Sequence, residues 1–114
     1  MKKQKIALIG YGVIGKRVAD AVALQDDMEL TGVADVISDW RISTAVEKGY
    51  SIFAANSDAH QNMTSAGIPV KGTMDELLAQ VDLAVDCTPK KIAAQNVETY
   101  KKLGLKFIMQ GGEK

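Results

Sequence analysis

A glycine-rich hexapeptide near the N-terminus, Gly10-Tyr-Gly-Val-Ile-Gly15, constrains the fold of this chain more than any other feature. It follows the nearly continuous apolar run 5–9, which indicates a strand buried on both faces. The stretch 13–25 after it carries apolar residues at helical spacing. The order of strand, glycine-rich turn and helix is typical of the phosphate-binding turn of a βαβ unit.

The rest of the chain continues to alternate short strand-like runs with amphipathic stretches. Further strands are predicted over 29–34, 51–54, 82–87 and 105–109. Helices are predicted over 40–48, from Ser57 or Asp58 as N-cap to 66, over 73–81 from the capping box Thr73-Met-Asp-Glu76, and over 92–103. The pattern predicts one α/β domain over 1–114, a doubly wound, mostly parallel sheet of the Rossmann type. We count about five strands, one short of a complete six-stranded dinucleotide-binding sheet.

Each glycine of the hexapeptide has a physical role in such a turn. Gly10 permits the tight turn, Gly12 lets the backbone approach a pyrophosphate, and Gly15 allows close packing of helix on strand. The amides of Val13 and Ile14 then point at the phosphates from the positive end of a helix. The motif therefore predicts a dinucleotide cofactor.

Asp35 stands twenty residues after Gly15, at the end of the second predicted strand. A carboxylate there accepts hydrogen bonds from the ribose hydroxyls, and it repels a 2′-phosphate, so it favours NAD over NADP. Arg41, with Lys16 and Arg17 as weaker candidates, could offset this preference by pairing with a phosphate. NADP therefore stays open as a second cofactor.

The segment 86–89 ends the fourth predicted strand, which flanks the ligand crevice of a doubly wound sheet. Thr88 is therefore expected to touch the cofactor beyond the pyrophosphate, and Pro89 to stop the strand and shape the loop. Asp86 is expected to find hydrogen bonds from neighbouring loop amides. Cys87 is interpreted as structural rather than nucleophilic, because it lies in a buried strand and His60 is not close in sequence.

Two aromatic residues leave their role open. Trp40 and Tyr50 either pack around the adenine side of the cofactor or belong to an interface, and the sequence does not choose between these readings.

Composition narrows the classes of partner. Lys+Arg and Asp+Glu each number 14, so charge gives no reason to expect nucleic acid or an anionic membrane surface. One cysteine excludes an internal disulfide and a multi-thiolate metal site, so no metal site is expected. The apolar run after the basic N-terminus is too short for a signal or membrane segment, which favours a soluble intracellular domain.

Four blocks of the chain, in order, resemble one enzyme family. The blocks are Ile9-Gly-Tyr-Gly-Val-Ile-Gly-Lys-Arg-Val18, Gln25-Asp-Asp-Met-Glu-Leu30, Val81-Asp-Leu-Ala-Val-Asp-Cys-Thr-Pro89 and Gln110-Gly-Gly-Glu-Lys114. They are similar to the archaeal-type (type II) phosphorylating glyceraldehyde-3-phosphate dehydrogenases. The resemblance implies a Rossmann domain followed by a catalytic domain, in a cytoplasmic tetramer. It also implies oxidation of a small phosphorylated aldehyde through a cysteine thiohemiacetal, hydride transfer to NAD(P), and phosphorolysis of the thioester.

The resemblance also assigns cofactor contacts. It implies contacts to the phosphates from Gly12, Val13 and Ile14, contacts along the cofactor from Thr88 and Pro89, and Gly111 near the nicotinamide. The family's nucleophile lies beyond position 114, so no catalytic residue is assigned here. We expect the 114 residues to bind cofactor and to catalyse nothing by themselves.

Two departures from the family pattern bear on the cofactor. Members that prefer NADP tend to carry a basic residue where this chain has Asp35, which favours NAD. Lys90 and Lys91 replace the small residues expected after the Thr-Pro pair, which alters the nicotinamide-side loop or adds positive charge near the cofactor.

Alternative functions remain at this stage. The same N-terminal pattern fits a semialdehyde dehydrogenase, a dihydrodipicolinate-type reductase, or a stand-alone NAD(H)-sensing module. If the last strand of the sheet is missing, its unpaired edge and an apolar patch are expected to favour self-association into a homo-oligomer.

Overall fold

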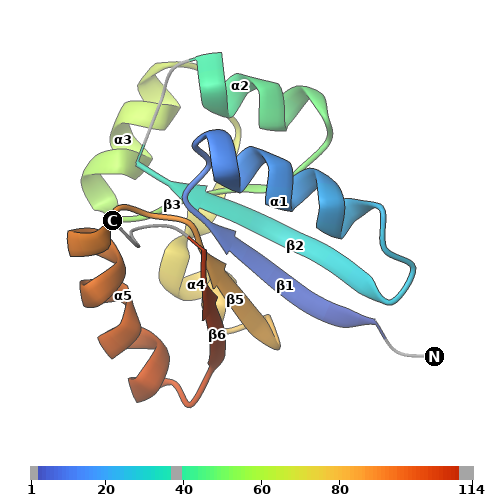
Figure 1. Ribbon diagram of the computed structural model, residues 1–114. Coiled ribbons are helices and arrows are strands. Elements are labelled where there is room, and N and C mark those ends of the chain that lie inside the picture. The colour runs from blue at the N-terminus through green and yellow to red at the C-terminus, as the bar shows by residue number, and fades with distance from the viewer. Residues whose placement is uncertain (1–2, 37–39, 111–114) are drawn as a thin grey trace.

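The computed structural model describes residues 3–36 and 40–110, and these form one six-stranded parallel sheet in the order β4-β3-β2-β1-β5-β6 (Figure 1). The strands are β1 (Gln4–Ile9), β2 (Met28–Asp35), β3 (Ile52–Ala54), β4 (Val70–Thr73), β5 (Leu83–Asp86) and β6 (Lys106–Met109). Every strand pair is parallel. The predicted doubly wound α/β fold is therefore confirmed.

Helices cover both faces of this sheet. They are α1 (Val13–Ala23), α2 (Trp40–Glu47), α3 (Ser57–Ser65), α4 (Met74–Leu78) and α5 (Lys90–Lys102). Buried residues of α1, α2 and α3 share one core cluster, whereas those of α4 and α5 share the other. The domain thus has three layers, with its sheet in the middle.

The first strand illustrates why both faces of the sheet are dry. Ile6 and Leu8 pack into the core under α1, α2 and α3, whereas Ala7 and Ile9 pack into the core under α4 and α5. All four side chains are at most 2% exposed. Successive strand residues point to opposite faces, so a continuous apolar run is what a two-sided burial requires.

The strand count is the main correction to the sequence analysis. About five strands were expected, and the additional one is β4, Val70–Thr73, which lies at the edge beyond β3. It was missed because Pro69 precedes a run of only four residues that contains Gly72, and both residue types weaken a strand pattern. Glycine suits position 72 because a Cβ there would lie only 2.9 Å from a carboxylate oxygen of Glu76.

The opposite edge bears on the expected self-association. Within the described ranges, β6 pairs only with β5, and Ile108 on it is 44% exposed. Every open sheet has two edge strands, here β4 and β6, so this edge does not test the expectation of a missing last strand. Association of the chain with itself stays a prediction.

Helix boundaries needed smaller corrections. Asn56 caps α3, with its Oδ1 accepting from the amide of Ala59 at 2.8 Å, in place of the expected Ser57 or Asp58. The predicted capping box is confirmed, but α4 ends at Leu78 rather than near residue 81. The last helix begins at Lys90, directly after Pro89, because proline has the backbone geometry that a helix start accepts. None of the helices within residues 3–36 and 40–110 combines the length and the hydropathy needed to cross a bilayer.

Replacing Tyr11 with Phe is expected to raise the free energy of unfolding by about 1 kcal/mol. Tyr11 is 1% exposed, and its hydroxyl has no hydrogen-bond partner among the described residues. Removing a buried polar atom that lacks a partner removes its desolvation cost. Urea denaturation, compared at equal slope, measures the change.

Tyr50→Phe is the matched control. The Tyr50 hydroxyl donates to Asp20 Oδ1 at 2.7 Å, so its removal is expected to lower the free energy of unfolding by about 1 kcal/mol. Equal losses in both variants would contradict the assignment of the Tyr11 hydroxyl as unpaired.

Candidate functional site

The glycine loop lies between the carboxyl ends of β2 and β5. The Gly10 amide donates to the carbonyl of Ala34 at 2.8 Å, and the Cys87 amide donates to the carbonyl of Ile9 at 2.7 Å. Gly10 has φ +93°, and a Cβ there would lie 2.9 Å from Thr88 Cγ2. A side chain at position 10 is therefore excluded both by backbone conformation and by space.

Gly15 presses the first turn of α1 against that loop. A Cβ at Gly15 would lie 1.9 Å from the carbonyl oxygen of Gly10, a distance that no packing adjustment of a side chain relieves. The close packing of helix on turn that the sequence predicted for Gly15 is thus confirmed. This contact fixes where the N-terminus of α1 points.

The N-terminus of α1 is open. Gly12 is its N-cap, no side chain caps the helix, and its first turn contains no acidic residue. Among the described residues, apart from Gly12 itself and its neighbours in the chain, no atom lies within 4 Å of the position that a Gly12 Cβ would take. Val13 and Ile14 are 72% and 51% exposed. A helix start without a side-chain acceptor leaves amide donors and a positive dipole end for an anion.

Asp35 lies where the sequence placed it, at the end of β2. Its Oδ2 accepts from the amide of Tyr11 at 2.5 Å, and its Oδ1 accepts from the amide of Val36 at 2.6 Å. The carboxylate therefore contacts the glycine loop directly, between Gly10 and Gly12. Asp35 thus helps to shape the loop in addition to its expected ribose contact, and the sequence did not reveal this.

Asp86, at the end of β5, is fully buried, and its carboxylate accepts four hydrogen bonds. Its Oδ1 accepts from the amide of Thr88 at 2.9 Å and also from the Thr88 hydroxyl. Its Oδ2 accepts from Asn96 Nδ2 at 3.0 Å and from the Tyr100 hydroxyl at 2.6 Å. The predicted bond from a loop amide is confirmed, and the two contacts from α5 were missed. Asn96 and Tyr100 are four apart and share a helix face, which was the available signal.

The remaining predicted crevice residues lie beside this network. Thr88 is 9% exposed, with its methyl group facing Gly10 and its hydroxyl bound to Asp86. Pro89 is exposed and is the N-cap of α5. Gly111 lies outside the described residues. The structure therefore brings Thr88 and the glycine loop together at the carboxyl edge of the sheet.

Cys87 stands between Asp86 and Thr88 in the chain, and its surroundings favour the neutral thiol over the thiolate. Burial, and then the nearby Asp86 carboxylate, raise the pKa of Cys87 to about 11. Both causes disfavour the thiolate, which is the nucleophilic form. The interpretation of Cys87 as structural agrees with this environment.

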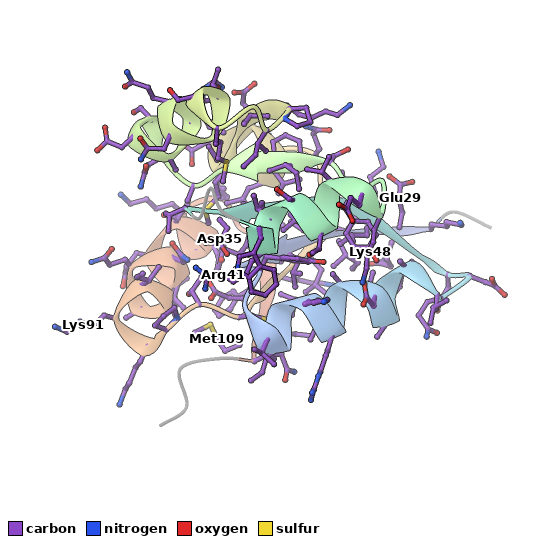
Figure 2. The ribbon with its side chains drawn as sticks, turned by 90° about the horizontal axis from the view of Figure 1, so that it is seen from above. Glu29, Asp35, Arg41, Lys48, Lys91 and Met109 are labelled. Atoms are coloured by element: carbon purple, nitrogen blue, oxygen red, sulfur yellow. The ribbon has the colours of Figure 1, made fainter. Side chains whose placement is uncertain are left out.

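A hollow of about 290 Å³ opens beside the glycine loop, between α1 and α2. Its lining consists of Tyr11, Gly12 and Val13 from the loop and helix start, Lys16, Arg17 and Asp20 from α1, and Trp40, Arg41 and Thr44 from α2. Figure 2 labels Arg41 on α2 and Asp35 at the end of β2. The hollow is therefore continuous with the open start of α1.

A larger cavity of about 470 Å³ lies at the other end of the sheet. It is lined by residues around the starts of β1, β5 and β6, among them Gln4, Asp82 and Lys106. Ligands of open α/β sheets bind outside the carboxyl ends of the strands, so we assign the site to the smaller hollow and the glycine loop. Within the described part of the chain, no three His, Cys, Asp or Glu side chains gather as a metal site.

Comparison with known proteins gives matches over nearly the whole chain. The family model described as dihydrodipicolinate reductase, N-terminus, matches residues 4–111. The glyceraldehyde-3-phosphate dehydrogenase of Methanothermobacter thermautotrophicus is 48% identical over 109 residues, which are 96% of this chain and 32% of that protein. The enzyme of the same name from Methanococcus maripaludis (strain C5) is 52% identical over 110 residues, again 96% of this chain and 32% of that protein. The resemblance noted in the sequence is thus confirmed, and the chain spans about a third of the length of these relatives.

Solved structures with a similar fold are more distant in sequence. GenD2 from gentamicin A biosynthesis, solved in complex with NAD, superposes with a TM-score of 0.64 at 21% identity, covering 96% of this chain and 27% of that one. The UDP-N-acetylglucosamine 3-dehydrogenase GnnA from Acidithiobacillus ferrooxidans gives a TM-score of 0.58 at 20% identity, covering 96% of this chain and 30% of that one. At about 20% identity, these superpositions support the fold of this chain and say nothing of its substrate.

Alkylation of Cys87 by iodoacetamide is expected to be slow in the folded chain. With a pKa of about 11 in place of an ordinary 9.0, about a hundredfold less thiolate is present near pH 8. The rate is expected to rise with pH until about pH 11 and to increase sharply when guanidinium chloride unfolds the chain. Mass spectrometry of the single cysteine measures it. Equal rates in the folded and unfolded chain would contradict the structural interpretation.

Proposed function

The chain belongs to the family of dihydrodipicolinate reductase N-terminal domains, and on that premise we propose that it is a dinucleotide-binding domain that takes NAD, with NADP as a second cofactor. In this proposal residues 1–114 act as one unit, and the diphosphate sits at the N-terminus of α1. The observation that carries the proposal is the open helix start at Gly12, with no side-chain cap, no acidic residue in the first turn and free space above it.

The roles of the site residues follow from their positions. Gly10 and Gly15 hold the turn, and the amides of Gly12, Val13 and Ile14 donate to the phosphates. Three main-chain donors at a helix start suit a diphosphate because they supply both hydrogen bonds and a positive dipole end.

Further contacts extend along the cofactor in both directions. Asp35 accepts from the ribose hydroxyls of the adenosine half. Thr88 and Pro89 border the crevice towards the nicotinamide, and we assign Gly111 to its far end. The buried Asp86 keeps Thr88 against Gly10 and so fixes the width of the crevice.

The bound nicotinamide supplies hydride transfer, and the residues of this chain bind and orient the cofactor. No residue of the chain is assigned to proton transfer or nucleophilic attack. Cys87 is unsuited to the latter because burial raises its pKa. We therefore propose that these 114 residues bind cofactor without catalysing a reaction alone.

For the parent protein we propose a phosphorylating glyceraldehyde-3-phosphate dehydrogenase. Support comes from relatives of that name at 48% and 52% identity across almost all of this chain. The proposed substrate is a small phosphorylated aldehyde, and the proposed setting is a cytoplasmic homo-oligomer. A dihydrodipicolinate-type reductase is the second candidate, because the matching family carries that description.

Substituting Gly12 tests the diphosphate site. Gly12 has φ −83° and an empty Cβ position, so Ala and Val fit the fold but project into the space proposed for the phosphates. We expect Gly12→Ala to weaken NAD binding severalfold and Gly12→Val at least tenfold, or about 1.4 kcal/mol. Isothermal titration calorimetry measures both.

Asn56→Ala is the matched control for Gly12→Val. It removes the N-cap of α3 and lowers stability by about 1 kcal/mol, but α3 contributes nothing to the proposed site. Its NAD affinity is expected to equal that of the original chain. If Gly12→Val bound NAD as tightly as Asn56→Ala does, the diphosphate would not sit on α1.

Assays of the full-length parent separate the two candidate activities. With glyceraldehyde 3-phosphate, inorganic phosphate and NAD or NADP, we expect reduced cofactor to form, with a dependence on phosphate. Turnover of dihydrodipicolinate with the reduced cofactors, and none of the aldehyde, would replace the first candidate by the second.

A further inference from the structure

Asp86 is a buried negative charge beside the crevice, and the proposed cofactor contacts give that charge no chemical role. It is the last residue of β5 and is 0% exposed. Its hydrogen-bond donors are the Thr88 amide and hydroxyl, Asn96 Nδ2 and the Tyr100 hydroxyl. All four donors are neutral groups, so they stabilise the carboxylate without cancelling its charge.

The field of this carboxylate extends beyond its hydrogen bonds. Asp86 is, after burial, the second cause that raises the pKa of the neighbouring Cys87 thiol to about 11. A buried charge acts over a longer distance than an exposed one, because water and salt screen it less. Asp86 binds Thr88, which we assign to the nicotinamide side of the crevice, so a ring bound there lies within this field.

Positive groups near the crevice oppose this charge only in part. Lys90 and Lys91 begin α5, and both are exposed, so water and ions screen them. The N-terminus of α5 adds a positive end equivalent to about half a charge. One full charge that is completely buried outweighs these contributions, so this side of the crevice is negative.

We infer that the charge of Asp86 makes the domain select the oxidised cofactor, NAD⁺, over the reduced cofactor, NADH. The oxidised ring carries a positive charge, which it loses when it accepts a hydride, that is, two electrons and one proton. Only the oxidised ring is therefore attracted by a negative charge behind the crevice. The inference rests on the proposed dinucleotide function and adds to it a preference for one redox state.

This selectivity suits a domain whose parent protein oxidises its substrate. The oxidised cofactor is held more tightly, and the reduced cofactor is released more easily because its ring has lost the attraction. Asp86 needs no contact with the ring for this effect, since charges interact at a distance.

The test compares the affinities of the 114-residue chain for NAD⁺, NADH and ADP-ribose before and after Asp86→Asn. Calorimetry measures NAD⁺ and ADP-ribose, and the fluorescence of the reduced nicotinamide measures NADH. We expect the preference for NAD⁺ over NADH to fall about tenfold, or about 30 mV in the potential of the bound two-electron couple. ADP-ribose lacks the nicotinamide ring, so its change in affinity measures any loosening of the crevice that is unrelated to charge.

Asn96→Lys tests the same charge while Asp86 stays in place. Asn96 is half-buried, and its Nδ2 lies 3.0 Å from Asp86 Oδ2, so a lysine at this position can pair its ammonium group with the carboxylate. The preference for NAD⁺ is expected to fall in this variant too. It decides the question if Asp86→Asn does not fold.

Tyr100→Phe and Asp26→Asn are the matched controls. The first removes a hydrogen bond to Asp86 but leaves its charge. The second removes an exposed carboxylate from the turn between α1 and β2, at the opposite end of the sheet. Neither variant is expected to lower the preference for NAD⁺, although Tyr100→Phe is expected to destabilise the fold.

The outcomes separate this inference from the proposed function. If the folded charge variants weaken the binding of NAD⁺, NADH and ADP-ribose by the same factor, the role of Asp86 is structural, and the inference is refuted while the dinucleotide function stands. A fall of the same size in Tyr100→Phe refutes it as well. If the original chain binds neither dinucleotide nor ADP-ribose, the proposed function fails and the inference fails with it.

Discussion

The close contact between Gly15 and the Gly10 carbonyl is the constraint on which the site depends. Because only a hydrogen fits at position 15, the first turn of α1 can lie directly on the turn that leaves β1. That contact aims the helix axis at the carboxyl edge of the sheet. It also leaves Gly12 at the surface, where its amide and those that follow meet no side-chain cap. Backbone sterics and helix electrostatics therefore act at the same six residues.

Two carboxylates on neighbouring parts of this edge have different roles because their surroundings differ. Asp86 is completely buried and receives bonds from Thr88, Asn96 and Tyr100, so it joins the crevice loop to α5. Asp35 is half-buried and receives two main-chain amides, so it joins the glycine loop to the end of β2. A buried carboxylate needs full satisfaction by donors, whereas a partly exposed one remains accessible to a ligand. This difference suits Asp86 to support and Asp35 to recognition.

Sequence periodicity predicted the fold well where the pattern was strong. The strand over the run 5–9, the helix that contains Gly15 and the strand predicted over 82–87 lie within two residues of where apolar spacing placed them, because burial against the sheet imposes that spacing. The short edge strand at Val70–Thr73 was missed, since four residues with a glycine carry little periodicity. The N-cap of α3 was predicted one or two residues too late, at Ser57 or Asp58 instead of Asn56. Asn, Ser and Asp all cap helices well, so residue type alone does not distinguish these neighbouring positions.

Some features of the candidate site could also be predicted from the sequence, and others could not. Its glycines and Asp35 were predictable because their roles depend on spacing along one βαβ unit. The contact of Asp35 with the Tyr11 amide, the bonds from Asn96 and Tyr100 to Asp86, and the presence of Arg17 and Arg41 on one hollow are tertiary features. Such pairs are distant in sequence, and single-sequence patterns carry no information on which helix faces meet. The sequence offers Arg41, and more weakly Lys16 and Arg17, as phosphate partners, but nothing in it places the three on one hollow.

The two enzyme names found for this region are compatible if this domain binds the cofactor and another part of the parent protein binds the substrate. A family described by a reductase and relatives named for an aldehyde dehydrogenase share this N-terminal region. The matched region of this chain contains the open helix start, the carboxyl edge of the sheet and Asp35 at the end of β2, which we assign to a dinucleotide and not to a substrate carbonyl. Substrate identity cannot then be read from the glycine loop, because a diphosphate is the same in both reactions. Cofactor identity depends on this domain in our proposal, because the ribose contact is assigned to Asp35 at the end of β2.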